Sequence, residues 1–278
     1  MLKLIKDKVL VLGSGFLGKA FKENGFAVVG RSDFEFDPDD EYAFEKFSEK
    51  YLADDTYDTV INCIGISDTR YCEDLSNWEA VRFGNSTLPE YLSSCCEHFD
   101  KKFVHISTGC LYDQNSRPNR EDDHLSTHCH YTVSKIFGEN GCNHNRDLIV
   151  RPRLFFGGFI DPKNLLCKIP EFEKHLNEIN SYSSVDTVVE SVVALLEYEQ
   201  IGIFNVAQEG YATIGEIAGA LSCPPKPPIT GTELQTDQRL CLVNNILDIS
   251  KLKQFYRPRE IFEELVRCND LMNSKFSK

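Results

Sequence analysis

The sequence predicts an α/β fold with a parallel, doubly wound sheet and a smaller C-terminal substrate-binding lid. Three observations support this prediction: short apolar strands alternate with helical stretches, a glycine-rich turn follows the first strand, and the alternation breaks down after residue 153. Strands joined in this way run in one direction, and such sheets bind ligands outside the carboxyl ends of their strands. A chain of 278 residues can bury the core of one large or two coupled domains.

The first strand is expected at residues 8–12, and it runs into a glycine-rich turn and then a helix. This order of elements is typical of dinucleotide binding and makes the predicted sheet Rossmann-like. Gly13 permits the tight turn, Gly15 lets the backbone approach a pyrophosphate, and Gly18 lets the helix pack on the strand. The helix N-terminus adds amide donors and a partial positive charge. A glycine-rich connection without a ligand is the alternative. The predicted cofactor-binding residues of this turn are Gly13, Ser14, Gly15, Phe16, Leu17 and Gly18.

The second strand, at 26–29, ends at a turn that bears on the choice of cofactor. An acid near this point usually binds a free ribose 2′-hydroxyl, whereas an arginine accommodates a 2′-phosphate. Arg31 and Ser32 therefore favour NADPH over NADH, although the neighbouring Asp33 is an acid. The alternative for Arg31 is a solvated loop cation.

Strands and helices continue to alternate after this point. Strands are expected at 58–63, 102–107 and 148–151, and helices at 78–99 and 131–140. Cys63, Ile64 and Gly65 stand at the end of the third strand and are also assigned to the cofactor. Thr108 follows the fourth strand, so it belongs to the same ligand-binding edge as Gly65 and the glycine turn.

Tyr131 and Lys135 are spaced for acid–base chemistry on a carbonyl group. Residues four apart share one face of a helix. An ammonium near a phenol favours the phenolate and lowers a pKa that is normally about 10. Such a tyrosine can protonate a carbonyl oxygen while hydride reaches the carbon, and the Thr108 hydroxyl can bind the same oxygen. The pair also occurs by chance on exposed helix faces, so its context carries the interpretation.

The second half of the chain has a different texture. Glycine and proline breaks interrupt the alternation after Arg153, and a helix at 213–221 begins at a threonine cap. We expect an NADP-binding Rossmann domain at 1–153, to which 185–206 returns. Residues 154–278 are expected to form the substrate-binding domain, which would close a substrate against the cofactor.

Composition narrows the class of protein. The net charge is −13 and no basic tract is present, which argues against nucleic acid or an anionic membrane as partner. No apolar run is long enough to span a bilayer, and no signal-peptide pattern stands at the N-terminus. Eleven scattered cysteines without a Cys-x-x-Cys pair favour reduced thiols in the cytoplasm. The run His128-Cys129-His130 is better explained as loop decoration than as a metal site, so no metal is predicted.

Several motifs together resemble one family. They are Val60–Gly65, Ser107–Leu111, Tyr131 with Lys135, Asp161–Asn164, Lys168-Ile169, Gly202–Val206 and Asn244–Lys251. The chain resembles extended short-chain dehydrogenase/reductases of the dTDP-4-dehydrorhamnose reductase type. Within that type it is most similar to the epimerase–reductases that finish nucleotide-L-rhamnose synthesis in plants and some giant viruses. The glycine motif departs from the usual extended form, because Leu12 stands at the first glycine position.

The resemblance implies a role for each matching residue. Thr108 matches the catalytic hydroxyl, Tyr131 the acid, and Lys135 the residue that tunes the tyrosine and binds the cofactor with it. Cys110 stands where the plant-type enzymes place an epimerisation acid/base, and Lys168 matches its partner lysine. Without the resemblance, Cys110 would be core packing and Lys168 a surface cation. The resemblance also implies a homodimer.

The implied activity is a 3,5-epimerase/4-reductase that converts UDP-4-keto-6-deoxy-D-glucose to UDP-L-rhamnose with NADPH. One alternative is a dTDP-4-dehydrorhamnose reductase without epimerase activity. Another is a non-catalytic NADP-binding regulatory subunit, similar to that of methionine adenosyltransferase. The joint presence of Thr108, Tyr131 and Lys135 argues against the last alternative. No residue distinguishes a uridine from a thymidine nucleotide.

Overall fold

The computed structural model describes residues 6–34, 36–37, 40, 42–113, 117–127, 129–230, 233 and 245–276. The chain packs into two compact units. The first unit comprises Met1–Ser107, His130–Val150 and Leu195–Ile203, and the second comprises Thr108–Cys129, Arg151–Ala194 and Phe204–Lys278. These units are defined by packing. The assignment of 1–153 to the cofactor and 154–278 to the substrate concerns binding and stays a prediction.

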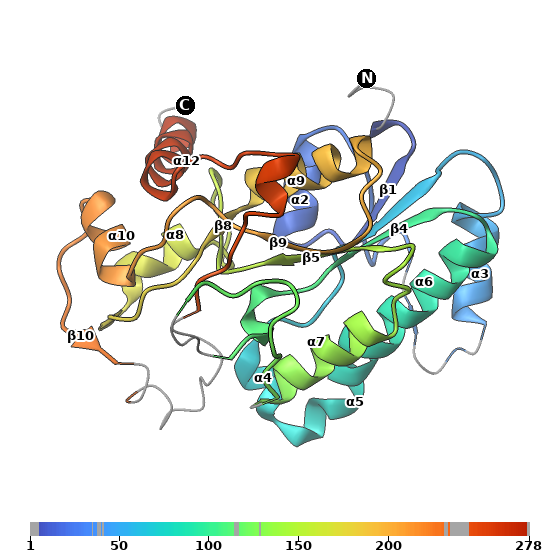
Figure 1. The fold of residues 1–278 in the computed structure, drawn as a ribbon, viewed down its shortest axis with the longest axis horizontal. Helices are drawn as coiled ribbons and strands as arrows, with labels where there is room; N and C mark the ends of the chain where they lie inside the picture. Colours follow the sequence, from blue (N-terminus) through green and yellow to red (C-terminus); the bar gives the residue numbers. More distant parts are fainter. Residues whose placement is uncertain are drawn as a thin grey trace. The chain divides into compact units, whose positions relative to one another are not determined.

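A six-stranded sheet confirms the predicted fold class (Figure 1). The strand order is β2-β1-β3-β4-β5-β9, and the pairings of β1 with β2 and β3, of β3 with β4, and of β4 with β5 are parallel. The strands are β1 (Val9–Leu12), β2 (Ala27–Val29), β3 (Thr59–Asn62), β4 (Lys102–Ile106), β5 (Leu148–Pro152) and β9 (Gly202–Val206). The order reverses beside β1, which is the switch point where ligands bind in doubly wound sheets.

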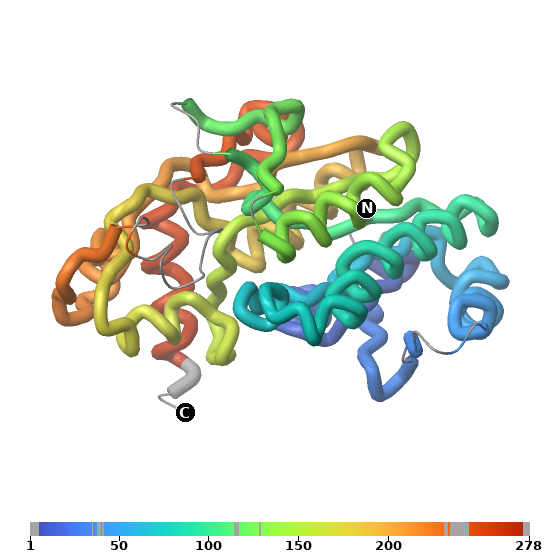
Figure 2. Tube along the Cα trace, turned by 90° about the horizontal axis from the view of Figure 1, so that it is seen from below, coloured from blue at the N-terminus to red at the C-terminus, as the bar shows by residue number. Residues whose placement is uncertain are grey.

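Helices of the first unit lie on both faces of the sheet. They are α2 (Phe16–Glu23), α3 (Ala43–Tyr51), α4 (Thr69–Glu73), η1 (Leu75–Asn77), α5 (Trp78–Arg82), η2 (Phe83–Thr87), α6 (Leu88–His98) and α7 (His130–Asn140). Right-handed connections put α2 on one face and α3 on the other, because β2 and β3 flank β1. Figure 2 shows α3, α6 and α7 side by side. The core between this helical layer and the sheet includes Leu10, Phe47, Val60, Leu92 and Ile149.

The second unit has its own core and two small parallel strand pairs. Strand β6 (Phe155–Phe156) pairs with β8 (Ser183–Ser184), and β7 (His175–Leu176) pairs with β10 (Pro228–Ile229). Its helical segments are η3 (Gly109–Leu111), α8 (Leu165–Lys168), η4 (Ile169–Glu171), most of α9 (Val185–Glu197), α10 (Ile214–Ala220), η6 (Leu252–Gln254) and α12 (Ile261–Phe276). The predicted cap is confirmed, because Thr213 forms a reciprocal capping box with Glu216 at the start of α10.

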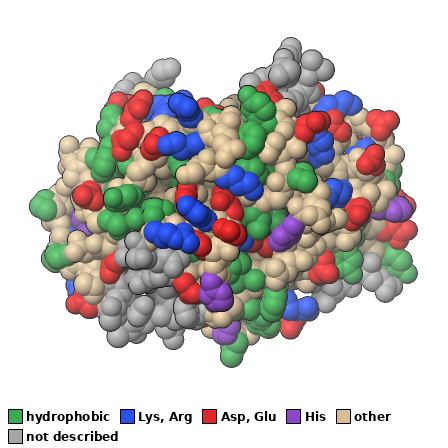
Figure 3. Space-filling model, viewed as in Figure 1, with side chains coloured by type: hydrophobic (Ala, Val, Ile, Leu, Met, Phe, Trp, Pro, Cys, Tyr) green, Lys and Arg blue, Asp and Glu red, His purple; other side chains and the backbone are tan. Residues whose placement is uncertain are grey.

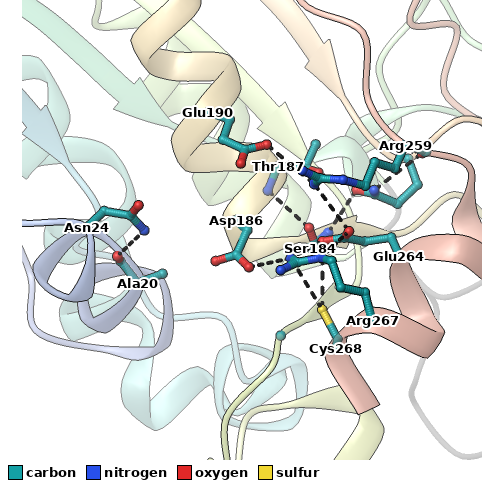
Figure 4. A network of polar contacts seen from close by, with 12 residues as sticks. Ala20, Asn24, Ser184, Asp186, Thr187, Glu190, Arg259, Glu264, Arg267 and Cys268 are labelled. Atoms are coloured by element: carbon teal, nitrogen blue, oxygen red, sulfur yellow. Dashed lines mark hydrogen bonds and ion pairs between the residues drawn. The ribbon is translucent and has the colours of Figure 1, made fainter. Parts of the chain in front are cut away.

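An ion-pair network joins α9 to α12 within the second unit (Figure 4). The Arg267 guanidinium lies 2.5 Å from Asp186 Oδ2 and 2.6 Å from Glu264 Oε1. Burial alone would raise the pKa of Glu264, but hydrogen bonds from Arg267 and Ser184 hold it below its usual value. Asp186, Glu264 and Cys268 are close enough to ligate a metal. The Arg267 guanidinium already supplies the positive charge there. Of the histidine–cysteine run considered as a metal site, Cys129 is buried and His128 lies outside the described residues.

The surface carries no dominant charge of one sign on the face seen in Figure 3. Acidic and basic side chains are interspersed there. Among the helices of the described ranges, none is both long and apolar enough to cross a membrane.

Candidate active site

The glycine turn after β1 is shaped by direct contact between backbone segments. Gly13 has φ +103°, a conformation that favours glycine, and its N–H donates to Val29 O at 2.8 Å. A Cβ on Gly13 would lie 3.1 Å from the Cys63 carbonyl carbon, so this turn passes against the end of β3. A Cβ on Gly18 would lie 1.8 Å from Gly13 O. Only glycine at position 18 therefore lets the first turn of α2 approach the loop this closely.

The same turn leaves its middle open. Gly15 is the N-cap of α2, is exposed, and would have no atom within 4 Å of an added Cβ. The Phe16 and Leu17 side chains are buried in the core, so these residues would offer a ligand their backbone N–H groups. Together with the exposed Ser14, the turn combines a helix N-terminus with the empty space that a pyrophosphate requires.

The turn after β2 presents a cation. Arg31 and Ser32 are both exposed. The Asp33 carboxylate accepts a hydrogen bond from the Gly30 N–H at 2.9 Å, and its backbone carbonyl accepts one from Lys50 at 3.0 Å. Asp33, an acid that could instead bind a free ribose 2′-hydroxyl, thus forms hydrogen bonds that hold the turn. Arg31 is left as the exposed side chain that a phosphate would meet.

Tyr131 and Lys135 lie one turn apart at the start of α7, and both are buried. The Lys135 ammonium donates to Ile106 O at 3.1 Å and lies 3.5 Å from His105 Nε2. Burial lowers the pKa of Lys135 to about 8. An added Cβ on Gly65 would lie 3.7 Å from Lys135 Nζ, so the predicted cofactor residues after β3 border this lysine.

Two side chains beside the lysine are neutral, whereas the buried Glu139 carboxylate attracts its charge. Burial lowers the pKa of His105 well below its ordinary value and raises that of the Cys63 thiol. With a pKa of about 8, Lys135 still carries a positive charge at neutral pH. Its charge can act on whatever lies next to it with little screening by water.

Asn85 holds α7 against the η2 turn. The sequence alone did not indicate this residue. Its side chain accepts a hydrogen bond from Ile66 N at 2.8 Å and donates to Ile66 O and to Ser134 Oγ at 2.9 and 3.0 Å. A Cβ on Gly138 would lie 2.1 Å from Asn85 O, so α7 packs directly on the η2 backbone. The π-helical turn that carries Asn85 gave no signal in the sequence.

Thr108 and Cys110 lie together in the second unit, where η3 follows the end of β4. Thr108 is buried and Cys110 is half-buried. The Thr108 hydroxyl oxygen accepts a hydrogen bond from the Cys110 N–H at 3.2 Å. Since that bond uses a lone pair, the hydroxyl proton stays available for a second acceptor such as a carbonyl oxygen.

Arg153 contacts the thiol, and sequence reasoning missed this residue as well. It directly follows β5, and its Nη1 lies 3.0 Å from Cys110 Sγ. The family resemblance assigns Lys168 a different role, that of the acid acting from the opposite face of the sugar. The side chain of that lysine is exposed at the end of α8 and makes no hydrogen bond or ion pair with any described residue. Asn164 caps this helix by accepting from Leu166 N at 3.1 Å.

The predicted site residues thus form two groups. The first unit brings the glycine turn, Gly65 and the Tyr131–Lys135 pair to the carboxyl ends of its strands. The second unit brings Thr108 and Cys110 together. The chain leads directly from one group to the other, because Thr108 follows Ser107 at the end of β4.

A family model described as the RmlD substrate binding domain matches residues 8–189. The chain belongs to this family. The match spans both groups of residues and confirms the resemblance that the motifs indicated.

Two solved structures share the fold along nearly the whole chain. The L780 UDP-rhamnose synthase of Acanthamoeba polyphaga mimivirus superposes with a TM-score of 0.81 at 19% identity, covering 95% of this chain and 99% of that chain. A dTDP-4-dehydrorhamnose reductase of Clostridium acetobutylicum superposes with a TM-score of 0.79 at 20% identity, covering 95% and 98%.

One curated relative carries two activities in its name. It is the bifunctional dTDP-4-dehydrorhamnose 3,5-epimerase/dTDP-4-dehydrorhamnose reductase of Arabidopsis thaliana. It is 23% identical over 192 residues, which are 63% of this chain and 64% of that protein.

Proposed function

We propose that this RmlD-family protein is an NADPH-dependent reductase of a nucleotide-linked 4-keto-6-deoxyhexose, and that it also epimerises C3 and C5 of the sugar. The leading substrate is UDP-4-keto-6-deoxy-D-glucose and the leading product is UDP-L-rhamnose. The observation that carries the proposal is the buried Lys135 ammonium, one helical turn from Tyr131 and beside Gly65. An acid–base pair beside a cofactor edge is what reduction of a ketone requires.

The residues of the glycine turn and of the two neighbouring strand ends fit NADPH. The open space over Gly15 and the amides at the start of α2 would hold the pyrophosphate. Arg31 and Ser32 would hold the 2′-phosphate, and Cys63, Ile64 and Gly65 would border the rest of the nucleotide. NADPH supplies a hydride when bound.

The chain's own residues supply the proton and stabilise charge. Tyr131 gives its proton to the carbonyl oxygen at C4, and the Lys135 ammonium, one helical turn away, stabilises the phenolate that results. The family resemblance gives Thr108 a hydrogen bond to the same oxygen, and its hydroxyl proton is not used by the bond from the Cys110 N–H. A positioned acid of this kind commonly contributes about 10²–10⁴-fold in rate.

Epimerisation uses the acidity of the carbons beside the same ketone. The Cys110 thiolate would remove a proton from C3 or C5, and the hydrogen bonds that serve reduction would stabilise the enolate oxygen. Lys168 would return a proton to the opposite face. The family resemblance and the bifunctional name of the Arabidopsis relative support this half of the proposal.

Reduction alone is a second candidate function. The exposed position of Lys168, without a hydrogen bond or ion pair to any described residue, favours it. In that case the substrate would already carry the L-configuration, and Cys110 would have no catalytic role.

One experiment separates the two. The protein is incubated with NADPH and either UDP- or dTDP-4-keto-6-deoxyglucose in D₂O, and the product is analysed by NMR. The proposal expects L-rhamnose with deuterium at C3 and C5. The better of the two substrates shows whether the enzyme prefers the uridine or the thymidine nucleotide. Turnover of a supplied 4-keto-L-rhamnose nucleotide without any deuterium uptake would establish reduction alone. No turnover of any 4-ketosugar with intact NADPH binding would support a non-catalytic subunit.

A further inference from the structure

The contact between Arg153 and Cys110 leaves a buried charge to be accounted for. Arg153 is 1% exposed and remains protonated at any physiological pH. A buried guanidinium is normally paired with a carboxylate, because leaving a buried charge uncompensated strongly destabilises a protein. Among the described residues, no carboxylate oxygen lies within 4 Å of this guanidinium. Its described side-chain partners are the neutral amide of Asn180 and the sulfur of Cys110.

The geometry aims one donor at the sulfur. Arg153 Nε and Nη2 both donate to Asn180 Oδ1, at 3.2 and 2.5 Å. The guanidinium is planar and rigid, so two fixed nitrogens determine the position of the third. That third nitrogen, Nη1, lies 3.0 Å from Cys110 Sγ.

Backbone packing holds the two residues at this separation. The Arg153 N–H donates to Ser183 Oγ at 2.8 Å. A Cβ on Gly109 would lie 3.4 Å from Arg153 Cβ, so the η3 turn that carries Cys110 rests on the stem of the arginine. Asn180, which is fully buried, also accepts a hydrogen bond from the Asn245 N–H at 3.3 Å. Neighbouring residues therefore hold both Arg153 and Asn180 in place.

We infer that Arg153 is a positioning residue that holds Cys110 as a thiolate, with Asn180 locking the guanidinium in place. The thiolate is the form in which cysteine takes up a proton, and it would be a counter-ion that the described carboxylates do not provide for the buried guanidinium. The inference rests on the proposed epimerase function for its catalytic meaning. The ion pair itself can be tested without any substrate.

The test measures the rate at which iodoacetamide alkylates Cys110 at pH 7, followed residue by residue with mass spectrometry. Arg153→Met should slow alkylation of Cys110 by about ten- to hundredfold, since a hydrogen bond to a charged group contributes roughly 1.5–3 kcal/mol. Arg153→Lys keeps the charge but loses the planar guanidinium, so Cys110 should be alkylated at a rate between those of the wild type and of Arg153→Met.

Two more variants protect the test against simple misfolding. Asn180→Asp keeps the oxygen acceptor but gives Arg153 a carboxylate counter-ion. Alkylation of Cys110 should therefore slow, although the hydrogen bonds from Arg153 to residue 180 are retained. Arg151→Lys is the matched control. Arg151 is also buried in β5, but it donates to Tyr112 Oη and Glu121 O, and its replacement should leave the Cys110 rate unchanged. All variants are compared at equal folded fraction, measured by circular dichroism.

The outcomes are decisive in either direction. Equal alkylation of Cys110 in folded wild type, Arg153→Met and Asn180→Asp would overturn the inference, even if the protein epimerises its substrate. If the inference holds, Arg153→Met should also lose deuterium uptake at C3 and C5 while it still reduces a pre-epimerised sugar. Absence of deuterium uptake in the wild type, with alkylation still dependent on Arg153, would refute the proposed epimerase function and leave the ion pair standing.

Discussion

Alanine substitutions at Gly18 and Gly15 should affect different properties of the protein. The first should lower its stability, and the second its affinity for NADPH. At Gly18 the new Cβ would lie 1.8 Å from Gly13 O, whereas ordinary contacts begin at 3.4 Å. The backbone would have to move by about 1.6 Å, the difference between these two distances. Overpacking costs about 1–3 kcal/mol where side chains can adjust, and here the obstacle is backbone. Alanine recovers about 1 kcal/mol of helix propensity, so a net loss of about 2 kcal/mol or more is expected.

At Gly15 the same substitution meets no atom within 4 Å. The residue has φ −71°, which alanine adopts without strain, and only a loss of about 1 kcal/mol or less is expected from the poorer N-cap. The methyl group would, however, stand in the space proposed for the pyrophosphate. NADPH affinity should fall by about tenfold or more, because its backbone contacts depend on close approach.

Urea unfolding and NADPH titration by fluorescence together distinguish the two variants. Gly18→Ala should unfold at clearly lower urea, and Gly15→Ala should unfold near the wild type but bind NADPH weakly. Wild-type NADPH affinity in Gly15→Ala would show that the cofactor does not lie on this turn. Wild-type stability in Gly18→Ala would refute the close packing of the turn against α2.

Three further predictions concern the cofactor and the reduction. Arg31→Ala should lower the affinity for NADPH much more than that for NADH, and a wild-type preference for NADH in titration would overturn this assignment. Tyr131→Phe should bind NADPH normally but lose about 10²–10⁴-fold in the reduction rate measured at 340 nm, unless the tyrosine is not the acid. Because burial lowers the pKa of Lys135 to about 8, its charge is lost as the pH rises through that value. kcat/KM for reduction should therefore fall above about pH 8. If Lys135→Met shows the same decrease at high pH, the decrease has another origin.

Local patterns in the sequence were enough to predict the fold class and the individual parts of the site. A strand followed by Gly13, Gly15 and Gly18 predicts its turn, since each requirement is met within a few residues. The spacing of Tyr131 and Lys135 places them on one helix face for the same reason. The motifs also indicated the family that the comparison then established.

The tertiary structure decided how these parts are held and charged. Arg153 and Cys110 are 43 residues apart, and Asn85 and Ser134 are 49 apart, so no local pattern predicts either contact. The family resemblance implied Lys168 as the acid that acts with Cys110, which stays a prediction, whereas only the tertiary structure reveals that Arg153 contacts Cys110. Nor does the spacing of Lys135 reveal that burial lowers its pKa to about 8. Periodicity and turn chemistry act over a few residues, but burial and electrostatic pairing depend on which distant segments the fold packs together.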